Sequence, residues 1–201
     1  MSFLYEFIFA PASEAFEKDQ AYIRPAIEVL KVQKVRVIYA GIQTEKPQVF
    51  LVVGWNSVED HKAFSTSGAY ANFIAALAPS LASDAVLTSK LVYFPSDIVV
   101  ALTAPVTELL YTKPKDGHSQ ASVSETMAAI TEVTASAVTE GICTGGSDGK
   151  AVNADDVILV LGWDSVEHQN EFIKRPSNWE VVKNIGPKAD INMMHSIFTT
   201  Y

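Results

Sequence analysis

Residues 54–64 read GWNSVEDHKAF and residues 162–172 read GWDSVEHQNEF, so one phrase occurs twice, 108 positions apart. Six of its positions are identical: Gly54/Gly162, Trp55/Trp163, Ser57/Ser165, Val58/Val166, Glu59/Glu167 and Phe64/Phe172. The preceding run repeats as well, as VFLVV at residues 49–53 and VILVL at residues 157–161. A period near 100 residues indicates tandem domains and not a solenoid of short units. The chain is therefore predicted to be a duplicated module.

The length agrees with this interpretation, because 201 residues can form two domains of about 100 residues each. The repeats are predicted at residues 1–96 and 104–201. The join between them, residues 96–104, reads SDIVVALTA and is too apolar for a free linker. We expect it to pack, as an extra strand or as a crossing segment.

The same order of elements is predicted in both halves. Branched and aromatic runs bounded by Pro, Gly or polar residues indicate strands. In the first half these are residues 4–9, 35–42, 49–54 and 86–94, and in the second half residues 108–112, 141–145, 157–162 and 191–201. Apolar residues at helical spacing fill the gaps between the first and second and between the third and fourth strands of each half.

Each half thus follows the order strand–helix–strand–strand–helix–strand. This is the ferredoxin-like plan, with one antiparallel sheet and helices on one of its faces. The fold class is therefore α+β. We expect the two sheets to bury their open faces against each other, because each would otherwise expose an apolar surface.

The repeated phrase has a structural explanation of its own. Asn56 and Asp164 stand where a helix N-cap belongs, and Glu59 and Glu167 follow at the third helical position, as in a capping box. The preceding glycine allows the strand to turn sharply, and each tryptophan is expected between sheet and helix. In the second half, Ser122 with Glu125 predicts a capping box that opens the first helix.

A strand that ends in Trp, followed by Ser-x-Glu and an apolar helix, resembles the dimeric α+β barrel superfamily. That superfamily includes antibiotic-biosynthesis-type monooxygenases, stress-responsive A/B barrel proteins, heme-degrading monooxygenases and polyketide cyclases of the olivetolic acid type. The resemblance covers both halves, and its tandem form is most similar to fungal members. It implies an intramolecular version of the dimeric barrel, but the superfamily hosts several chemistries.

The resemblance can be tested at individual residues. The olivetolic acid type of cyclase uses a Tyr and a His on the helix after the phrase, and these positions match Phe64 and Tyr70 in the first repeat. Heme-degrading members place their ligating His at a position that matches Ile74. Both chemistries are therefore disfavoured. Trp55 and Trp163 could fill the substrate-positioning Trp role of the antibiotic-type monooxygenases, although matching Arg and Asn partners are missing.

Histidines are the candidate catalytic groups, because imidazole titrates near neutral pH. His61 lies at a position that is often His in the superfamily, and His195 lies on the last predicted strand. His168 is shifted by one residue, which turns it about 100° around the helix relative to His61. We expect His61 and His195 to be catalytic, and the first repeat, with His61, to hold the active site if there is only one.

Aromatic side chains are the candidate walls of a binding pocket. The predicted substrate-binding residues are Trp55, Trp163, Phe64, Tyr70, Tyr5 and Trp179. Aromatic residues at strand and helix spacing also serve as ordinary core, and that alternative stays open for each of them. The ligand expected in such a pocket is a small apolar or aromatic molecule.

Composition excludes several classes of function. The net charge of −8 argues against nucleic-acid binding, which needs a basic face. Cys143 is the single cysteine, and no two histidines have metal-ligand spacing, so neither a metal nor another cofactor is expected. The N-terminal run SFLYEFIFAPA carries Glu6 and lacks a basic segment, so we interpret it as a strand and not a signal peptide. No membrane span is expected, and the single cysteine fits a reducing setting, so we expect a cytoplasmic location.

Two functions remain open at this stage. The first is a cofactor-free monooxygenase or a cyclase-like enzyme of secondary metabolism that acts on an apolar or aromatic substrate. The second is a non-catalytic stress-responsive A/B barrel protein or ligand carrier. Either could exist as a homodimer of the fused chain.

Overall fold

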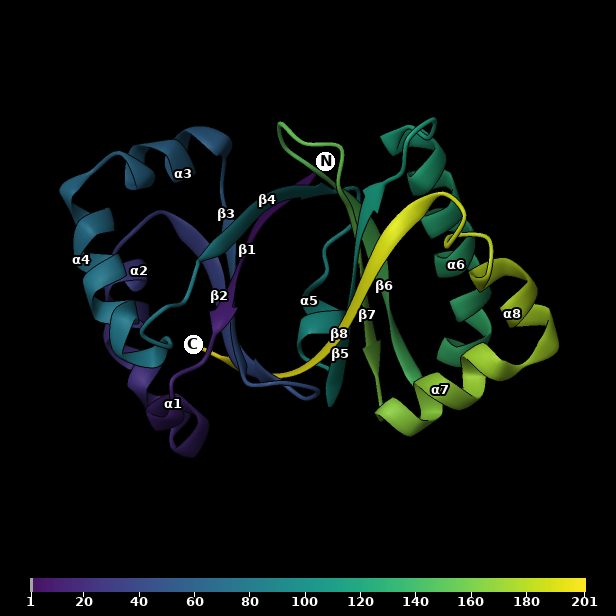
Figure 1. Cartoon of the computed structure of the whole chain (residues 1–201), viewed down its shortest axis with the longest axis horizontal. Coiled ribbons are helices and arrows are strands. Elements are labelled where there is room, and N and C mark those ends of the chain that lie inside the picture. The colour runs from purple at the N-terminus through teal and green to yellow at the C-terminus, as the bar shows by residue number, and fades with distance from the viewer. Residues whose placement is uncertain (1) are drawn as a thin grey trace. The chain divides into compact units, whose positions relative to one another are not determined.

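The computed structural model describes residues 2–201, in which helices and antiparallel strands alternate along the chain (Figure 1). The first half consists of β1 (Phe3–Pro11), α1 (Glu14–Lys18), the 3₁₀ turn η1 (Gln20–Ile23), α2 (Arg24–Lys31), β2 (Val35–Gln43), β3 (Gln48–Trp55), α3 (Val58–Ser65), α4 (Gly68–Leu77), the 3₁₀ turn η2 (Ala78–Ser80) and β4 (Thr88–Phe94). The second half consists of α5 (Val99–Leu102), β5 (Val106–Pro114), α6 (Gln120–Thr139), β6 (Cys143–Ala151), β7 (Val157–Trp163), α7 (Val166–Lys174), α8 (Pro176–Val182) and β8 (Ala189–Thr200). The predicted α+β class with antiparallel strands is confirmed.

The chain divides into two compact units. One contains Phe3–Leu91 and Phe198–Tyr201, and the other contains Ser2 and Val92–Ile197. The last strand of each half therefore begins in one unit and ends in the other. The repeat boundaries at residues 96 and 104 describe the duplication in sequence and stay a prediction.

In the unit that contains the first phrase, β3 lies between β1 and β2. The register pairs Leu4 with Trp55 on one side and Ile42 with Val49 on the other. All eight residues of β3 are buried, as expected for a central strand that is covered on both faces. Helices α2, α3 and α4 lie on one side of these strands in Figure 1.

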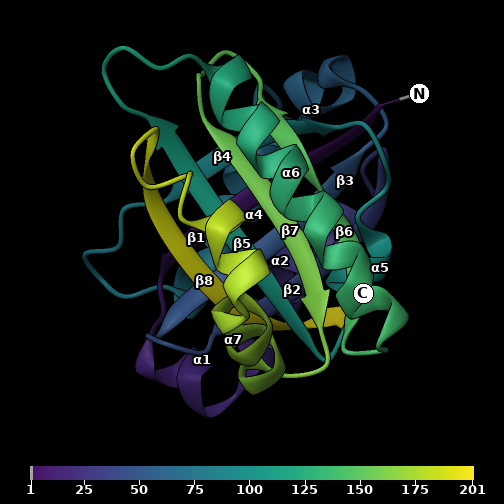
Figure 2. The ribbon, with the colours of Figure 1, turned by 90° about the vertical axis from the view of Figure 1, so that its right-hand side faces the viewer.

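In the other unit the strand order is β8–β5–β7–β6, and Val92 and Tyr93 of β4 pair with β6. Helices α6, α7 and α8 cover one face of this sheet, which faces the viewer in Figure 2. Apolar side chains of α6, such as Val123, Met127 and Ile130, join Leu159 and Leu161 of β7 in one buried cluster. The cluster fixes the distance between helix and sheet, and with it the space in which the site described below lies.

The phrase caps its helix one residue later than predicted. Ser57 and Ser165 are the N-caps of α3 and α7, and their hydroxyls accept hydrogen bonds from the backbone N–H groups of Asp60 and His168. The extended backbone at each serine lets its oxygen reach the third helical N–H, whereas Asn56 donates to the Lys34 carbonyl. Helix α6 instead begins earlier than predicted, since its N-cap is Ser119, three residues before Ser122.

The two glycines of the phrase serve close packing and not a turn. A Cβ on Gly54 would lie 2.7 Å from Val37 Cγ2, and one on Gly162 would lie 2.1 Å from Thr144 Oγ1 and 2.9 Å from Ala101 Cα. Neither glycine has a positive φ. Any side chain would therefore push the neighbouring strand or helix away from the phrase.

Two segments differ from the sequence predictions. The stretch expected as a short, poor strand at residues 141–145 is the nine-residue strand β6 (Cys143–Ala151). It runs through Gly146, where a Cβ would meet the carbonyl oxygen of Val160 at 1.8 Å, so the glycine permits close strand contact. The join forms the short helix α5 and not a strand, because Ala101 and Leu102 turn inward and are fully buried.

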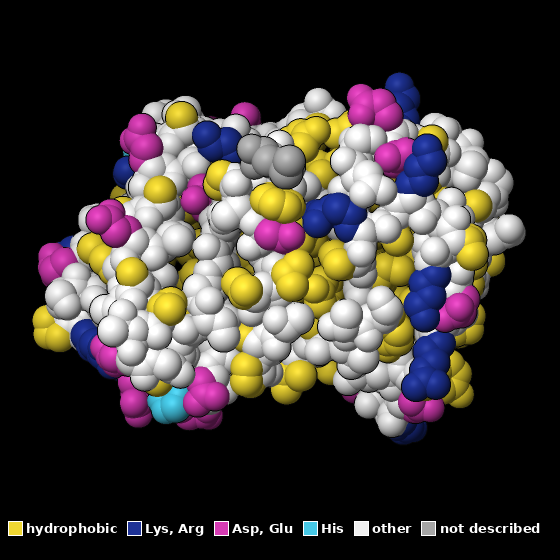
Figure 3. Space-filling model, turned by 180° about the vertical axis from the view of Figure 1, so that it is seen from behind, with side chains coloured by type: hydrophobic (Ala, Val, Ile, Leu, Met, Phe, Trp, Pro, Cys, Tyr) yellow, Lys and Arg dark blue, Asp and Glu magenta, His cyan; other side chains and the backbone are white. Residues whose placement is uncertain are grey.

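No helix within residues 2–201 combines the length and apolarity needed to cross a bilayer. On the face shown in Figure 3, basic side chains are interspersed with acidic and apolar ones.

Candidate functional site

A buried tryptophan–glutamate pair occurs in both repeats. Trp163 Nε1 donates a hydrogen bond of 2.8 Å to Oε2 of Glu108, and Trp55 Nε1 donates one of 3.1 Å to Oε2 of Glu6. Both carboxyl groups are almost inaccessible, with 4% of Glu108 and 7% of Glu6 exposed. The tryptophan of each repeated phrase thus holds a carboxyl group on the first strand of its own repeat.

Strand register explains the pairing. Glu108 lies opposite Leu161, two residues before Trp163, and Glu6 lies opposite Val53, two residues before Trp55. Side chains two apart on a strand share a face, so each indole points to the same side of its sheet as the facing glutamate. That side is the one covered by helices.

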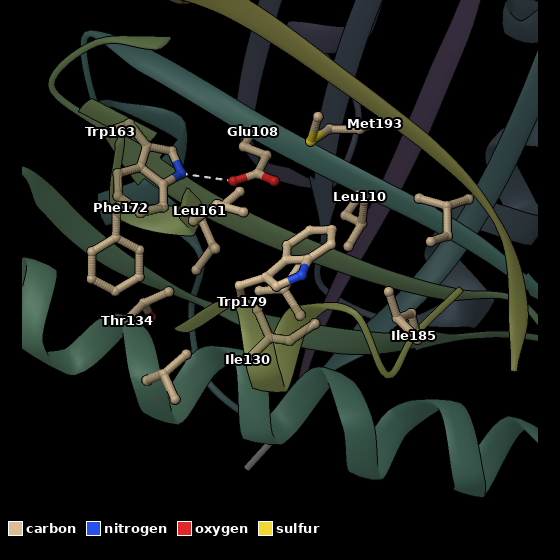
Figure 4. A pocket seen from close by; sticks show the side chains of 14 residues that line it. Glu108, Leu110, Ile130, Thr134, Leu161, Trp163, Phe172, Trp179, Ile185 and Met193 are labelled. Atoms are coloured by element: carbon tan, nitrogen blue, oxygen red, sulfur yellow. Dashed lines mark hydrogen bonds between the residues drawn. The ribbon is translucent and has the colours of Figure 1, made fainter. Parts of the chain in front are cut away.

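In the second repeat this pair lies at a cavity of about 220 Å³ between the sheet and helices α6, α7 and α8 (Figure 4). Its walls include Leu110, Leu161, Trp163, Phe172, Trp179 and Met193. Among the lining side chains only Glu108 and Thr134 carry oxygen, and the Thr134 hydroxyl donates to the carbonyl of Thr131. Glu108 is therefore the polar group that a bound molecule would meet in an otherwise apolar site.

The environment of Glu108 raises the pKa of its carboxyl group above the ordinary value of 4.5. Burial is the main cause, since it disfavours the charged form. Hydrogen bonding from Trp163, the positive potential of His195 and hydrogen bonding from Gln169 oppose the rise without cancelling it. A carboxyl group of this kind exchanges its proton closer to neutral pH, which suits acid–base chemistry.

His195 lies beside Glu108. The two residues are register partners on β8 and β5, and His195 is 3% exposed. On the same strand, Ile191 and Met193 line the cavity. Since residues two apart on a strand share a face, His195 continues that row on β8, but it is not among the residues that line the cavity. Its positive potential acts on the Glu108 carboxyl group.

The residue equivalent to His61 in the second repeat is Gln169. It is fully buried, and its amide contributes to the hydrogen bonding of Glu108. His168 lies one position earlier and interacts with Asp164 at 3.2 Å. Gln169, which matches His61, therefore lies beside the glutamate Glu108. His168, which is turned about 100° around the helix, lies on the outer surface of α7.

The first repeat surrounds its glutamate with more polar groups. Ser89 Oγ donates to Glu6 Oε1 at 2.6 Å, and His61 Nε2 lies 3.4 Å from the same oxygen. The His61 ring also meets Trp55 edge-on, with centroids 5.3 Å apart. Glu6, Ser89, His61 and Trp55 form a compact polar cluster.

Aromatic side chains determine how much space lies beside each phrase. In the first repeat, Tyr70 and Phe73 of α4 pack against Phe64, with ring centroids 5.7 and 5.8 Å away. The residues 108 positions later are Asn178 and Val181, which are smaller than the aromatic side chains they replace. The second repeat therefore leaves room beside Phe172 where the first is filled by rings.

The predicted site residues fall into separate groups. Trp163 and Trp179 line the cavity of the second repeat, with His195 behind it. Trp55, Phe64, Tyr70 and His61 lie together in the first repeat. Tyr5 is apart from both groups, because it neighbours Glu6 on β1 and so faces the other side of the sheet, under the guanidinium of Arg36.

Sequence reasoning missed Glu6 and Glu108 as site residues. The available signal was a single acidic residue inside an apolar strand run, at the same place in both copies: LYEFIF and VTELLY. Burying a charge in an apolar strand costs free energy unless the charge is paired. Because a glutamate occurs there in both copies, a buried partner is expected for each glutamate. Within residues 2–201 no three His, Cys, Asp or Glu side chains are grouped so that they could hold a metal ion.

Comparisons with known proteins give the fold. No family model and no curated protein matches the sequence. A proposed monooxygenase from Lactobacillus acidophilus aligns with a TM-score of 0.62 and 12% identity, over 100% of this chain and 96% of that one. A proposed monooxygenase from Fusobacterium nucleatum gives 0.69 and 11% over 98% and 94%, and an anthrone oxidase-like protein gives 0.70 and 10% over 99% and 92%. The chain thus shares its fold with these three proteins.

Proposed function

We propose that this protein binds a small apolar or aromatic molecule in the cavity of the second repeat and that Glu108 is its acid–base group. The observation that carries the proposal is one buried carboxyl group of raised pKa in the wall of an otherwise apolar cavity. We also propose that the chain is a tandem fused form of the dimeric α+β barrel superfamily, similar to fungal members. A cytoplasmic location is part of the same proposal.

The proposed reaction is a cofactor-free monooxygenation of an aromatic substrate. Glu108 in its carboxylate form takes the proton of an acidic O–H or C–H group, so that the ring gains electron density. A ring carbon then gives two electrons to O₂ and forms a C–O bond. Glu108 returns its proton to the outer peroxide oxygen, and loss of water, which also takes the hydrogen of that ring carbon, leaves one oxygen atom as a carbonyl and the other in the water. Fold similarity to an anthrone oxidase-like protein supports this class of reaction.

His195 is the proposed partner of Glu108 in this chemistry. Its position directly across the strand pair lets its positive form stabilise the carboxylate. It is a positioning residue, because it does not line the cavity and acts through Glu108. A cyclase-like reaction, which needs a proton transfer but no O₂, would use the same two residues.

A non-catalytic ligand carrier of the stress-responsive A/B barrel type is the second candidate. The nearly uniform apolar lining favours this candidate, because a carrier needs apolar contact and no set of reactive groups. Among the lining residues, Glu108 can take part in proton transfer, whereas the Thr134 hydroxyl already donates to a backbone carbonyl. Both candidates require binding, and they differ in turnover.

The test uses 1-naphthol, which is oxidised to 1,4-naphthoquinone by one O₂ with release of one water. We expect the protein to bind 1-naphthol and to consume O₂ with it, and Glu108→Gln to keep binding while turnover falls by about 100-fold or more. Binding by the wild type without O₂ consumption would support the carrier. No binding at all would overturn the proposal.

The matched control is Glu6→Gln, which removes the equivalent carboxyl group of the first repeat. We expect it to leave binding and turnover unchanged, because Glu6 does not line the cavity. If Glu6→Gln or His61→Ala abolishes turnover instead, the site lies in the first repeat, as the sequence predicts. Light scattering on the same samples tests the predicted homodimer of the fused chain.

A further inference from the structure

The mouth of the cavity is formed by side chains that are both exposed and apolar. Trp179 of α8 lines the cavity and is 50% exposed, while Ile191 and Met193 of β8 line it and are 43% and 44% exposed. The inner walls differ, since Trp163 and Phe172 are each 1% exposed. A molecule that enters the cavity therefore passes the edge between α8 and β8.

Trp179 is the large side chain at this mouth. Figure 4 shows its indole facing Leu110 across the cavity, nearer the viewer than the Trp163–Glu108 pair. The residue 108 positions earlier is Ala71, so the ring is present only in the repeat that has this cavity beside its phrase. Position 179 thus carries a larger side chain than its counterpart in the first repeat, whereas the nearby positions Asn178 and Val181 carry smaller ones.

Helix α8 is short and is separated from α7 by a break in the helical backbone. Arg175 has an extended conformation that ends α7, and Pro176 begins α8, which has only seven residues. Asn178 ties the helix to the Phe172 carbonyl, and the Arg175 guanidinium ties its start to Glu140 at the end of α6. Trp179 itself has half its surface in solvent and is not held by a buried partner along its whole length.

The cavity volume limits what fits with Trp179 in place. An apolar cavity of about 150 Å³ holds one benzene ring. The present cavity, at about 220 Å³, is half as large again and matches two fused rings. A third ring would have to displace wall atoms, and the packed inner walls resist this more strongly than the exposed indole does.

We propose that Trp179 sets the size limit of the cavity, so that its ligands are bicyclic aromatic compounds with one hydroxyl group directed at Glu108. This inference rests on the proposed binding function and gives its substrate class. With Trp179 shortened, the cavity opens toward solvent and accepts a tricyclic compound of the same kind.

The experiment compares 1-naphthol with 1-hydroxyanthracene, which differ by one ring and share the hydroxyl group. Equilibrium dialysis gives both dissociation constants. In an open apolar site the larger compound binds more tightly by about tenfold, because its extra ring buries more apolar surface. We expect the wild type to reverse this order and to bind 1-naphthol more tightly, on the order of tenfold.

In Trp179→Ala we expect the order of an open site, with 1-hydroxyanthracene bound more tightly, and in Trp179→Phe an intermediate ratio. Tyr93→Ala is the control, since Tyr93 is an aromatic residue of the same unit, is 41% exposed and does not line this cavity. It should keep the wild-type ratio. Circular dichroism checks that each variant is folded.

An unchanged ratio in Trp179→Ala would overturn the size limit while leaving the binding function intact. A wild type that prefers the tricyclic compound would overturn it as well. Absence of binding of both compounds to the wild type and to Trp179→Ala would instead overturn the proposed function itself.

Discussion

Trp163 and Glu108 are 55 residues apart in the sequence, and the indole nitrogen of one donates a 2.8 Å hydrogen bond to the buried carboxyl group of the other. The first repeat has the same pair in Trp55 and Glu6. The pairs differ in their surroundings: Glu6 also receives the Ser89 hydroxyl, whereas Glu108 faces an apolar cavity. The predictions below depend on this difference.

Replacing each tryptophan by phenylalanine should have unequal effects on stability. Trp163→Phe removes a 2.8 Å hydrogen bond to a fully buried carboxyl group that faces an apolar cavity, and we expect the free energy of unfolding to fall by about 2–3 kcal/mol. Trp55→Phe should cost less, because Ser89 Oγ still donates to Glu6 at 2.6 Å. Urea denaturation of both variants measures this. Equal losses would show that the indole–carboxyl bond is not what distinguishes the repeats.

Glu108 should give the stability of the protein a characteristic pH dependence. Its pKa is higher in the folded than in the unfolded chain, so its contribution to stability is complete below about pH 4.5 and is lost as the pH rises through the folded pKa. Glu108→Gln has no such group. We expect the difference in unfolding free energy, wild type minus variant, to fall from pH 4.5 upward and then level off. A difference that rises with pH would mean that the folded pKa is lowered.

The thiol of Cys143 should react slowly in the folded protein. The side chain is buried, and desolvation raises its pKa, with a smaller contribution from the negative potential of Glu108. Since the thiolate is the reactive form, we expect labelling by a disulfide reagent to be slow in buffer and fast in urea. The time course of absorbance on adding the reagent measures both rates. Fast labelling of the native protein would show that the region around β6 opens readily.

The ion pair between Arg175 and Glu140 should govern the mobility of α8. The hydrogen bonds from Arg175 lower the pKa of Glu140. The ion pair is therefore lost when the pH falls through this lowered pKa and the carboxylate is protonated. We expect Glu140→Gln to speed the dissociation of 1-naphthol and to increase quenching of Trp179 fluorescence by acrylamide. High salt should have a similar effect on the wild type, since both side chains are partly exposed and salt screens such pairs.

Glu180→Gln is the control for this effect. Its carboxylate pairs with Lys183, which follows within a turn, so the bond does not connect α8 to α6. We expect dissociation and quenching to match the wild type. If the two variants behave alike, loss of a surface charge and not release of α8 explains the result.

Much of the fold could be predicted from particular residues. The apolar run at residues 49–54 predicted a strand, and the structure forms β3 there with all eight residues buried. The cap of the phrase was predicted to within a residue, whereas that of α6 lies three residues earlier than predicted, at Ser119. Ser57 caps the helix where Asn56 was expected, and Gly54 permits close packing where a turn was expected. Both roles depend on which backbone group or side chain comes near, which the local sequence does not contain.

The sequence by itself determined the repeated phrase, the order of strands and helices, and the place of each tryptophan at a strand end. These features follow from local periodicity and from contacts between residues close along the chain. Only the tertiary structure decided that Trp163 meets Glu108, that His195 lies beside the carboxyl group, and that the cavity lies beside the second phrase and not the first. The cavity depends on the volumes of side chains from helices and strands that are far apart in sequence, where Asn178 and Val181 leave the room that Tyr70 and Phe73 fill.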